Sequence, residues 1–156
     1  MFVRYYLDLP VAFDDVEASV LETPGTWAPG MLGAAEERGE RLLAEVGFAV
    51  EARRIDKEVE ISLGEPYRLS RKTLLPLSWR ATGPERLFPQ LDADLEIAPL
   101  GPQRTQLSIS ARYRPPLGTL GRALDRAMLH RVAEATIKDF LDRVGERVGA
   151  RVASTT

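Results

Sequence analysis

Cysteine and histidine, which supply thiol nucleophiles and the usual transition-metal ligands, are nearly absent from the 156 residues. The chain contains no cysteine, which excludes a disulfide, a thiol nucleophile and a thiolate metal site. It contains one histidine, His130, so a single chain cannot build a site with several histidine ligands. No serine, histidine and aspartate can be matched to a catalytic triad. We therefore expect no metal and no cofactor, and we assign no catalytic residue.

His130 itself allows two interpretations. On a helix it lies one turn before Glu134, and the two side chains could form an ordinary surface contact, the more frequent role of an isolated histidine. Alternatively, the imidazole could act as an acid, a base or a hydrogen-bond donor in the wall of a binding cavity, because it titrates near neutral pH. Glu134 would then orient it.

The charge balance argues against a polyanionic partner. Lys and Arg number 21 and Asp and Glu number 23, for a formal net charge of -2, so a strongly cationic nucleic-acid-binding protein is excluded. Arginine outnumbers lysine by 18 to 3, which could indicate a phosphate or carboxylate ligand, but compositional bias explains it better. No glycine-rich phosphate-binding loop follows a predicted strand, so nucleotide binding has no support.

An acidic stripe at Asp92, Asp94 and Glu96 could suggest a divalent cation site. Same-face positions on a strand lie about 6.5–7 Å apart, however, which is too extended for a compact cage. The next strand offers Arg112 on its polar face, and the hairpin register directs Glu96 mainly toward Gln106. We interpret the stripe as one half of a set of cross-strand pairs on a solvated face.

The hydrophobic pattern predicts one strand, two helices, several strands and a long helix. A strand over 2–9 precedes a short helix that ends near Leu21. The Pro- and Gly-rich stretch 22–30 is predicted to be a break, and a second helix is predicted over 31–46. Alternating segments then predict antiparallel strands over 48–54, 59–63, 67–82, 91–97 and 104–114. The segment 67–82 would be one long or bent strand or two strands, with an edge or a bulge at Pro76.

The helical period returns over 119–148. The apolar arcs of its two halves do not superpose, which favours a bend or break near 128–131 over an exposed apolar patch that would meet a partner. Residues 1–150 would form a single domain and 151–156 a frayed tail. No apolar run approaches the roughly 18 residues of a membrane span and no leader pattern opens the chain, so we expect a cytosolic protein without stable membrane insertion.

The element order and the segment 75–144 resemble the START-like, helix-grip superfamily, also called SRPBCC. In its bacterial members, a Trp-containing strand, an alternating strand that ends at a Gly turn, and a strand that closes in Pro-Pro precede a long helix. The superfamily includes polyketide cyclases and dehydrases, aromatases, lipid-transport proteins and receptors for hydrophobic ligands. The resemblance implies an α+β fold in which a curved antiparallel sheet wraps around a long C-terminal helix, with two short helices after the first strand. It also implies a deep apolar cavity between sheet and helix, although a shared fold does not transfer an activity.

We expect the walls of this cavity to come from apolar side chains on one face of the sheet and on the last helix. Trp27 would lie at the entrance as a lid or in the core as a plug, and Trp79 would be core or cavity wall. The predicted ligand-binding residues are Trp27, Leu75, Leu77, Trp79, Phe88, Leu95, Leu107, Ile109, Tyr113, His130, Ile137 and Leu141.

Three functions fit the sequence. The first is a carrier or sensor that binds a hydrophobic or amphipathic small molecule such as a lipid or polyketide. The second is an enzyme of the cyclase or aromatase type, in which Tyr113, His130 and either Arg80 or Arg112 would direct the reaction. The third is a non-enzymatic interaction module that uses the apolar start of the last helix. Binding is favoured over catalysis, and the oligomeric state is left open.

Overall fold

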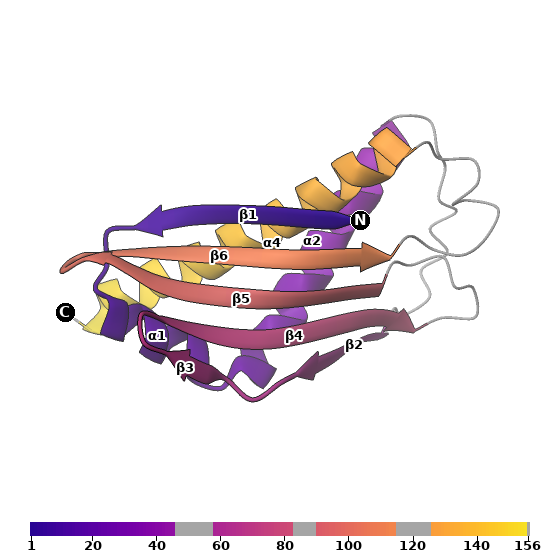
Figure 1. The fold of residues 1–156 in the computed structure, drawn as a ribbon. Coiled ribbons are helices and arrows are strands. Elements are labelled where there is room, and N and C mark those ends of the chain that lie inside the picture. The colour runs from indigo at the N-terminus through magenta and orange to yellow at the C-terminus, as the bar shows by residue number, and fades with distance from the viewer. Residues whose placement is uncertain (46–57, 83–89, 115–125, 156) are drawn as a thin grey trace.

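The computed structural model describes residues 1–45, 58–82, 90–114 and 126–155. The elements follow the predicted order of one strand, two helices, a run of strands and a long helix (Figure 1). They are β1 (Phe2–Leu9), α1 (Phe13–Leu21), α2 (Pro24–Glu45), β2 (Glu58–Leu63), β3 (Tyr67–Leu69), β4 (Lys72–Thr82), β5 (Gln90–Gly101), β6 (Arg104–Arg114) and α4 (Arg126–Thr155).

A single antiparallel sheet forms one layer of the molecule and the helices form the other. The strand order is β1-β6-β5-β4-β2, and the short β3 also pairs with β4. In Figure 1, α2 and α4 lie across the same face of this sheet. The predicted α+β helix-grip fold, a curved sheet around a long C-terminal helix, is therefore confirmed.

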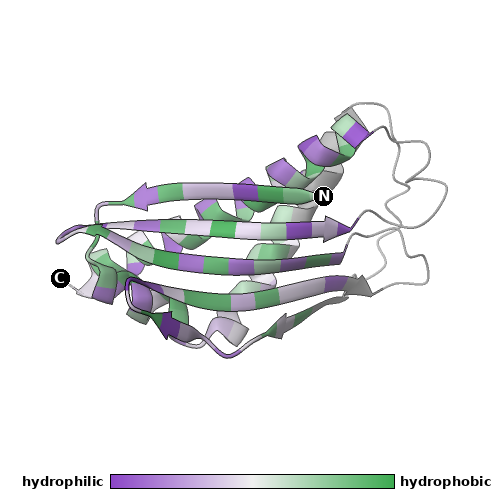
Figure 2. Ribbon diagram, in the orientation of Figure 1, coloured by the Kyte–Doolittle hydropathy of each residue, from purple (hydrophilic) through white to green (hydrophobic). Residues whose placement is uncertain are grey.

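Strict alternation of apolar and polar residues produces the two faces of the sheet. Along β5, buried residues alternate with exposed or half-buried ones from Gln90 to Ile97, and β6 follows the same pattern over most of its length. Figure 2 shows hydrophilic and hydrophobic residues alternating along these strands. Successive side chains of a strand point to opposite faces, so one sheet face is apolar and meets the helices. We call this the concave face and the other the outer face.

Pro76 lies where its neighbouring strand is interrupted. On one side it pairs with Asp94 of β5, and on the other side β2 ends at Leu63 while β3 begins only at Tyr67. In this gap the Gly64 amide donates to the Pro76 carbonyl at 2.8 Å. Because no strand residue faces Pro76 on this side, the missing proline N–H does not remove a hydrogen bond from the ladder. Pro76 therefore lies at a local edge of the sheet.

The predicted break over 22–30 is wrong, because α2 begins at Pro24, seven residues before the predicted start. Thr23 has a positive φ of 43°, and both the backbone amide and the hydroxyl of Thr26 donate to its carbonyl. Proline suits the first helical position, where its missing N–H has no partner to lose. The helix also tolerates Pro29, so Trp27 lies in a helix and not in a loop.

α4 continues without interruption through 128–131, so of the predicted bend or break the break is absent and the bend stays a prediction. It also extends through Thr155 where we expected a frayed tail. Arg151 forms an ion pair with Glu22 at the end of α1, and Val152 packs against the core, which together hold the last turns in place. The predicted strand over 48–54, the apolar arc before Arg126 and Phe88 lie outside the described residues.

Candidate ligand-binding site

The structure brings most of the predicted site residues into one continuous apolar cluster. β4, β5 and β6 supply their concave-face side chains, α4 supplies the face that packs on them, and α2 supplies Trp27. The predicted residues that are buried in this cluster are Trp27, Leu75, Leu77, Trp79, Leu95, Leu107, Ile109, Tyr113, Ile137 and Leu141.

The terminal row of the concave face consists of Trp79, Leu91 and Tyr113. Register places Trp79 of β4 opposite Leu91 of β5, and Leu91 opposite Tyr113 of β6. This row lies near the ends of the three strands that are remote from the β5–β6 hairpin, on the side where β1 begins (Figure 1). It therefore marks one end of the space between sheet and helices.

Packing differs along the concave face. Toward the β5–β6 hairpin, the side chains of β5, β6 and α4 are completely enclosed, as Leu95, Ile109 and Leu141 illustrate. Toward the terminal row some exposure remains, 5% at Tyr113, 8% at Leu129 and 7% at Val132, the last two on the first turns of α4. A close-packed core leaves no such access, so the accessible part of the space lies beside the terminal row.

The first turns of α4 add two side chains at the same end of the protein. Leu129 and Val132 are buried, but neither belongs to the continuous core cluster. Helical spacing puts Val132 and Thr136 one turn apart, so the hydroxyl of Thr136, itself buried, lies near these apolar side chains. This part of α4 therefore carries an apolar surface with one neutral polar group.

Trp79 is part of the wall of this space. Its side chain is almost fully buried, and its ring lies 6.1 Å from that of Phe140 on α4 with an interplanar angle of 52°. Tilted aromatic pairs at this separation are favourable beyond their buried area. The pair therefore joins β4 to α4 and fixes the indole at the end of the close-packed region.

The polar residues that are buried as a whole in the described part of the chain are neutral. They are serines and threonines, the phenol of Tyr113 and the indoles of Trp27 and Trp79, whereas Arg147 buries only its Nε and no Asp, Glu, Lys or His is buried there. Two of the hydroxyls, at Thr105 and Thr73, lie toward the hairpin end and donate to the Val11 carbonyl and to Glu17. Among the described residues, the terminal row therefore offers the hydroxyl of Tyr113 and no acid–base pair.

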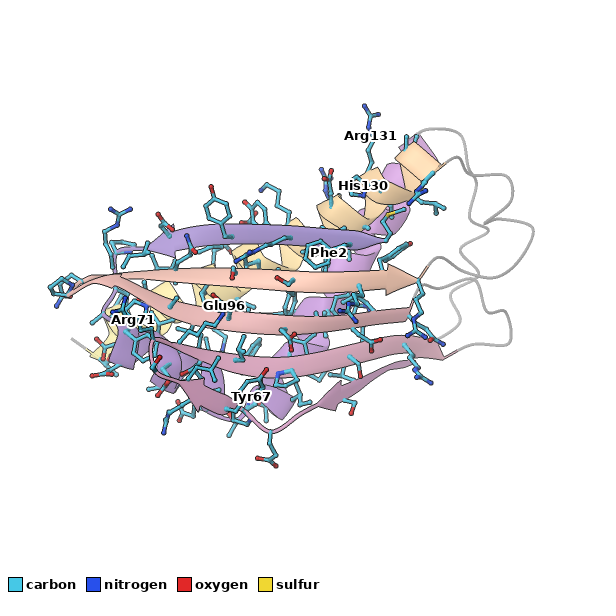
Figure 3. The ribbon with its side chains drawn as sticks, viewed as in Figure 1. Phe2, Tyr67, Arg71, Glu96, His130 and Arg131 are labelled. Atoms are coloured by element: carbon cyan, nitrogen blue, oxygen red, sulfur yellow. The ribbon has the colours of Figure 1, made fainter. Side chains whose placement is uncertain are left out.

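The groups expected to act together in an enzyme lie apart. His130 is on the first turns of α4 near the start of β1, half exposed, with its Nε2 atom 3.0 Å from the Glu134 carboxylate (Figure 3). Arg80 and Arg112 lie on the outer face of the sheet, whereas Tyr113 faces the helices. Of the two interpretations of His130, the structure shows the surface contact with Glu134.

The acidic stripe is engaged in cross-strand pairs. Glu96 lies opposite Ser108 and not opposite Gln106, because the β5–β6 turn shifts the register near Pro99 and Gly101. Its carboxylate receives a 3.0 Å contact from Lys72 on the other neighbouring strand. Within the described ranges, no three acidic or histidine side chains cluster in a way that could hold a metal ion.

Trp27 and Arg147 form a contact that the sequence did not indicate. The guanidinium of Arg147 lies over the indole ring, 5.6 Å from its centroid. The Trp27 side chain is buried between α2 and α4, the position of a plug in the core. Nothing in the local pattern around Arg147 distinguishes it from an arginine on a solvated helix face.

A second unexpected contact joins α1 to the β3–β4 hairpin. Glu17 accepts hydrogen bonds from Arg68 at 2.7 Å and from the buried hydroxyl of Thr73 at 2.5 Å. Partial burial by itself would raise the pKa of Glu17, but the hydrogen bonds from Arg68 and Thr73 outweigh it and hold the pKa below its ordinary value. This cluster lies at the end opposite the terminal row, so we assign it a structural role.

No model of a known protein family matches the chain, and no curated protein matches its sequence. Among solved structures, a conserved protein from Geobacillus kaustophilus is similar with a TM-score of 0.56 at 15% identity, over 96% of each chain. The Zhui aromatase/cyclase from Streptomyces sp. R1128 gives 0.47 at 14% identity over 97% of this chain and 95% of that chain. A START superfamily protein from Mycobacterium smegmatis gives 0.44 at 10% identity over 96% and 97%.

These similarities concern the fold alone. The similar solved structure from Geobacillus kaustophilus supports the fold that the resemblance implied. None of the helices in the described ranges contains a stretch that is both long enough and apolar enough to span a bilayer.

Proposed function

We propose that the protein binds a hydrophobic or amphipathic small molecule, such as a lipid or polyketide, between the concave face and the helices, beside the terminal row. The observation that carries this proposal is the change in packing between the sheet and α4, where full enclosure around Leu95 and Leu141 gives way to residual exposure at Tyr113, Leu129 and Val132. Burying apolar ligand surface there would supply affinity at roughly 25 cal/mol per Å².

The buried polar groups define the kind of ligand. A few polar groups in an apolar pocket set a ligand's orientation, and here they are the hydroxyls of Tyr113 and Thr136. Neither carries a charge near neutral pH, so they suit a hydroxyl, carbonyl or ester group better than a free carboxylate or phosphate. We propose that this binding takes place in the cytoplasm, the location that the sequence predicts.

Binding is preferred to a cyclase or aromatase reaction because such chemistry needs a titratable group at the ligand. His130 and Arg80 do not meet Tyr113, and no other ionisable side chain in the described ranges is buried beside it. The interaction-module alternative depended mainly on the predicted apolar arc before Arg126, which lies outside the described residues.

Native mass spectrometry of the protein purified from its own host would test the proposal, since a bound lipid-sized molecule adds a discrete mass. We expect Ala93→Leu, which adds volume on the concave face one row from Leu91, to abolish this mass while the far-UV circular dichroism is unchanged. Ala18→Leu on the exposed face of α1 makes the same change where no ligand is expected and serves as the control. No co-purifying molecule and no binding to a panel of fatty acids, sterols and polyketides would refute the proposal.

A further inference from the structure

β1 is the end strand of the sheet, and its outer edge is unpaired in the described part of the chain. It pairs with β6 along its whole length, from Phe2 to Leu9, on one side only. The opposite edge of the sheet is divided between β2 and the three-residue β3, but β1 is a continuous strand of eight residues without proline or glycine. A long continuous edge of this kind is a template for pairing with another strand.

The hydrogen-bonding pattern identifies the free backbone groups. Met1 and Tyr113 exchange two backbone hydrogen bonds, from the amino terminus to the Tyr113 carbonyl at 3.0 Å and from the Tyr113 amide to the Met1 carbonyl at 2.8 Å. Such pairs recur at every second residue of an antiparallel ladder. The backbone N–H and C=O groups that point away from β6 therefore belong to Phe2, Arg4, Tyr6 and Asp8.

The side chains of these four residues lie on the outer face, and two of them are exposed aromatics. Phe2 is 59% exposed and Tyr6 is 61% exposed, the two highest values among the large hydrophobic residues described (Figure 3). Arg4 and Asp8 are also exposed and carry opposite charges. The edge thus combines apolar area with a defined charge pattern.

The edge is also accessible from the side of the helices. An open groove of about 520 Å³ separates β1 from α4, lined on the strand by Val3, Arg4 and Tyr5 and on the helix by residues including Arg131 and Lys138. α4 therefore runs beside β1 without covering its outer edge.

We propose that two copies of this chain associate by antiparallel pairing of their β1 edges, with a twofold axis at Tyr6, so that their sheets become continuous. In this register Tyr6 faces Tyr6 of the second copy, Arg4 faces Asp8, and Asp8 faces Arg4. The backbone groups that point outward then pair with one another, and each dimer gains two cross-strand ion pairs and one aromatic pair.

Charge complementarity selects this register over its neighbours. A shift by two residues in one direction places Arg4 opposite Tyr6 and forms no ion pair, and a further shift places Arg4 opposite Arg4, which is repulsive. Shifts by one residue set outward-pointing backbone groups against inward-pointing ones and cannot form a ladder. The inference is independent of ligand binding, because the free edge of β1 points away from β6, whereas the proposed ligand lies over the concave face of β4, β5 and β6.

Sedimentation velocity of the full chain over a concentration series tests the proposal through paired charge variants. Arg4→Asp and Asp8→Arg should each weaken association at least about tenfold, because each sets like charges opposite one another. An equimolar mixture of the two variants should restore it, since Asp at position 4 then faces Arg at position 8 and Asp8 faces Arg4. High salt should weaken the wild-type dimer.

Tyr6→Pro provides a second test that does not depend on charge. The Tyr6 N–H points away from β6, so proline should leave the β1–β6 ladder intact and abolish association, whereas Tyr6→Val keeps the N–H and should retain part of it. Circular dichroism melts verify that each variant is folded, including Asp8→Arg, which also loses contacts with Arg104 and Gln106. A wild-type chain that stays monomeric up to about 1 mM, or a dimer that is insensitive to Arg4→Asp, Asp8→Arg and Tyr6→Pro, would overturn the proposal.

Discussion

The guanidinium of Arg147 lies over the indole of Trp27, and both side chains have a buried nitrogen without a hydrogen-bond acceptor, Nε of Arg147 and Nε1 of Trp27. The contact joins α4 to α2. A cation over an aromatic face is favourable by about 0.5–1 kcal/mol at an exposed site and by more when it is desolvated. An unsatisfied buried donor, however, costs about 1–3 kcal/mol. The two effects oppose each other, so the contribution of Arg147 to stability comes chiefly from the packing of its aliphatic stem.

This balance predicts different outcomes for two substitutions of Arg147. Arg147→Met keeps a long apolar side chain over Trp27 and removes one unsatisfied donor, so the free energy of unfolding should change by less than about 1 kcal/mol. Arg147→Ala removes the stem as well and should cost about 1–2 kcal/mol more than Met. Urea denaturation followed by tryptophan fluorescence measures both values. Equal losses for the two variants, both of which remove the charge, would show that the charge and not the stem stabilises the helix pair.

The pKa of Glu17 couples folding to pH. Because hydrogen bonds from Arg68 and Thr73 lower this pKa in the folded protein, the unfolded chain binds a proton more readily. The stabilisation is thus fully present above the unfolded-state pKa of about 4.5 and is lost as pH falls through the lower folded-state value. We expect the wild type to lose stability below about pH 5 and Glu17→Gln to lose less over the same interval.

Urea denaturation of both proteins at a series of pH values between about 3 and 7 measures this difference. Glu134→Gln is the matched control, because Glu134 is more than half exposed and pairs only with the half-exposed His130. If Glu17→Gln and Glu134→Gln changed the loss of stability at low pH equally, the hydrogen bonds of Glu17 would not be its cause.

The two regions of the concave face should respond differently to truncation. Leu141 is fully enclosed in the close-packed region, so Leu141→Ala should leave a cavity and cost about 2–5 kcal/mol. Leu129, on the same helix, lies outside the continuous core cluster and retains 8% exposure, so Leu129→Ala should cost less than about 2 kcal/mol. Chemical denaturation gives both values. Equal losses would mean that packing is uniform along α4 and would remove the main support for a binding space beside the terminal row.

The sequence predicted the strands well because apolar and polar residues alternate with a period of two. A shift of one residue would expose every apolar side chain of the strand, so the pattern allows one orientation only. The β5 and β6 segments, from Leu91 and from Arg104, illustrate this reliability. The same reasoning failed at Pro24 and Glu96. Proline at the first turn and proline in a loop look alike in a sequence, and the register at Glu96 depends on the turn near Gly101, which alternation does not determine.

Prediction of the site had a different limit. Apolar periodicity placed Leu75, Trp79 and Tyr113 on one face, as the structure has them, because the same pattern drives burial. It could not separate close-packed residues from those that border an accessible space, since both are equally apolar. The sequence also could not predict the partner of Arg147, because its contact with Trp27 depends on how α2 and α4 cross.

Two glycines one turn apart on α4 provide a final test of how the helix packs on β1. A Cβ atom added at Gly145 would lie 3.2 Å and 3.3 Å from the two terminal methyl groups of Leu7, whereas nothing lies within 4 Å of a Cβ at Gly149. Replacing glycine by alanine in a helix gains about 1 kcal/mol from propensity. Gly149→Ala should therefore stabilise the protein by about that amount.

At Gly145 the same gain meets a steric cost. The Leu7 side chain is packed against the core, so it can yield only by moving α4 away from β1 or by changing rotamer. We expect Gly145→Ala to be at least about 1 kcal/mol less stable than Gly149→Ala and Gly145→Val to be destabilised further, because overpacking grows with each added methyl group. Thermal and urea denaturation of the three variants measure this order. If Gly145→Ala stabilised the protein as much as Gly149→Ala does, α4 would not approach β1 closely enough to require glycine.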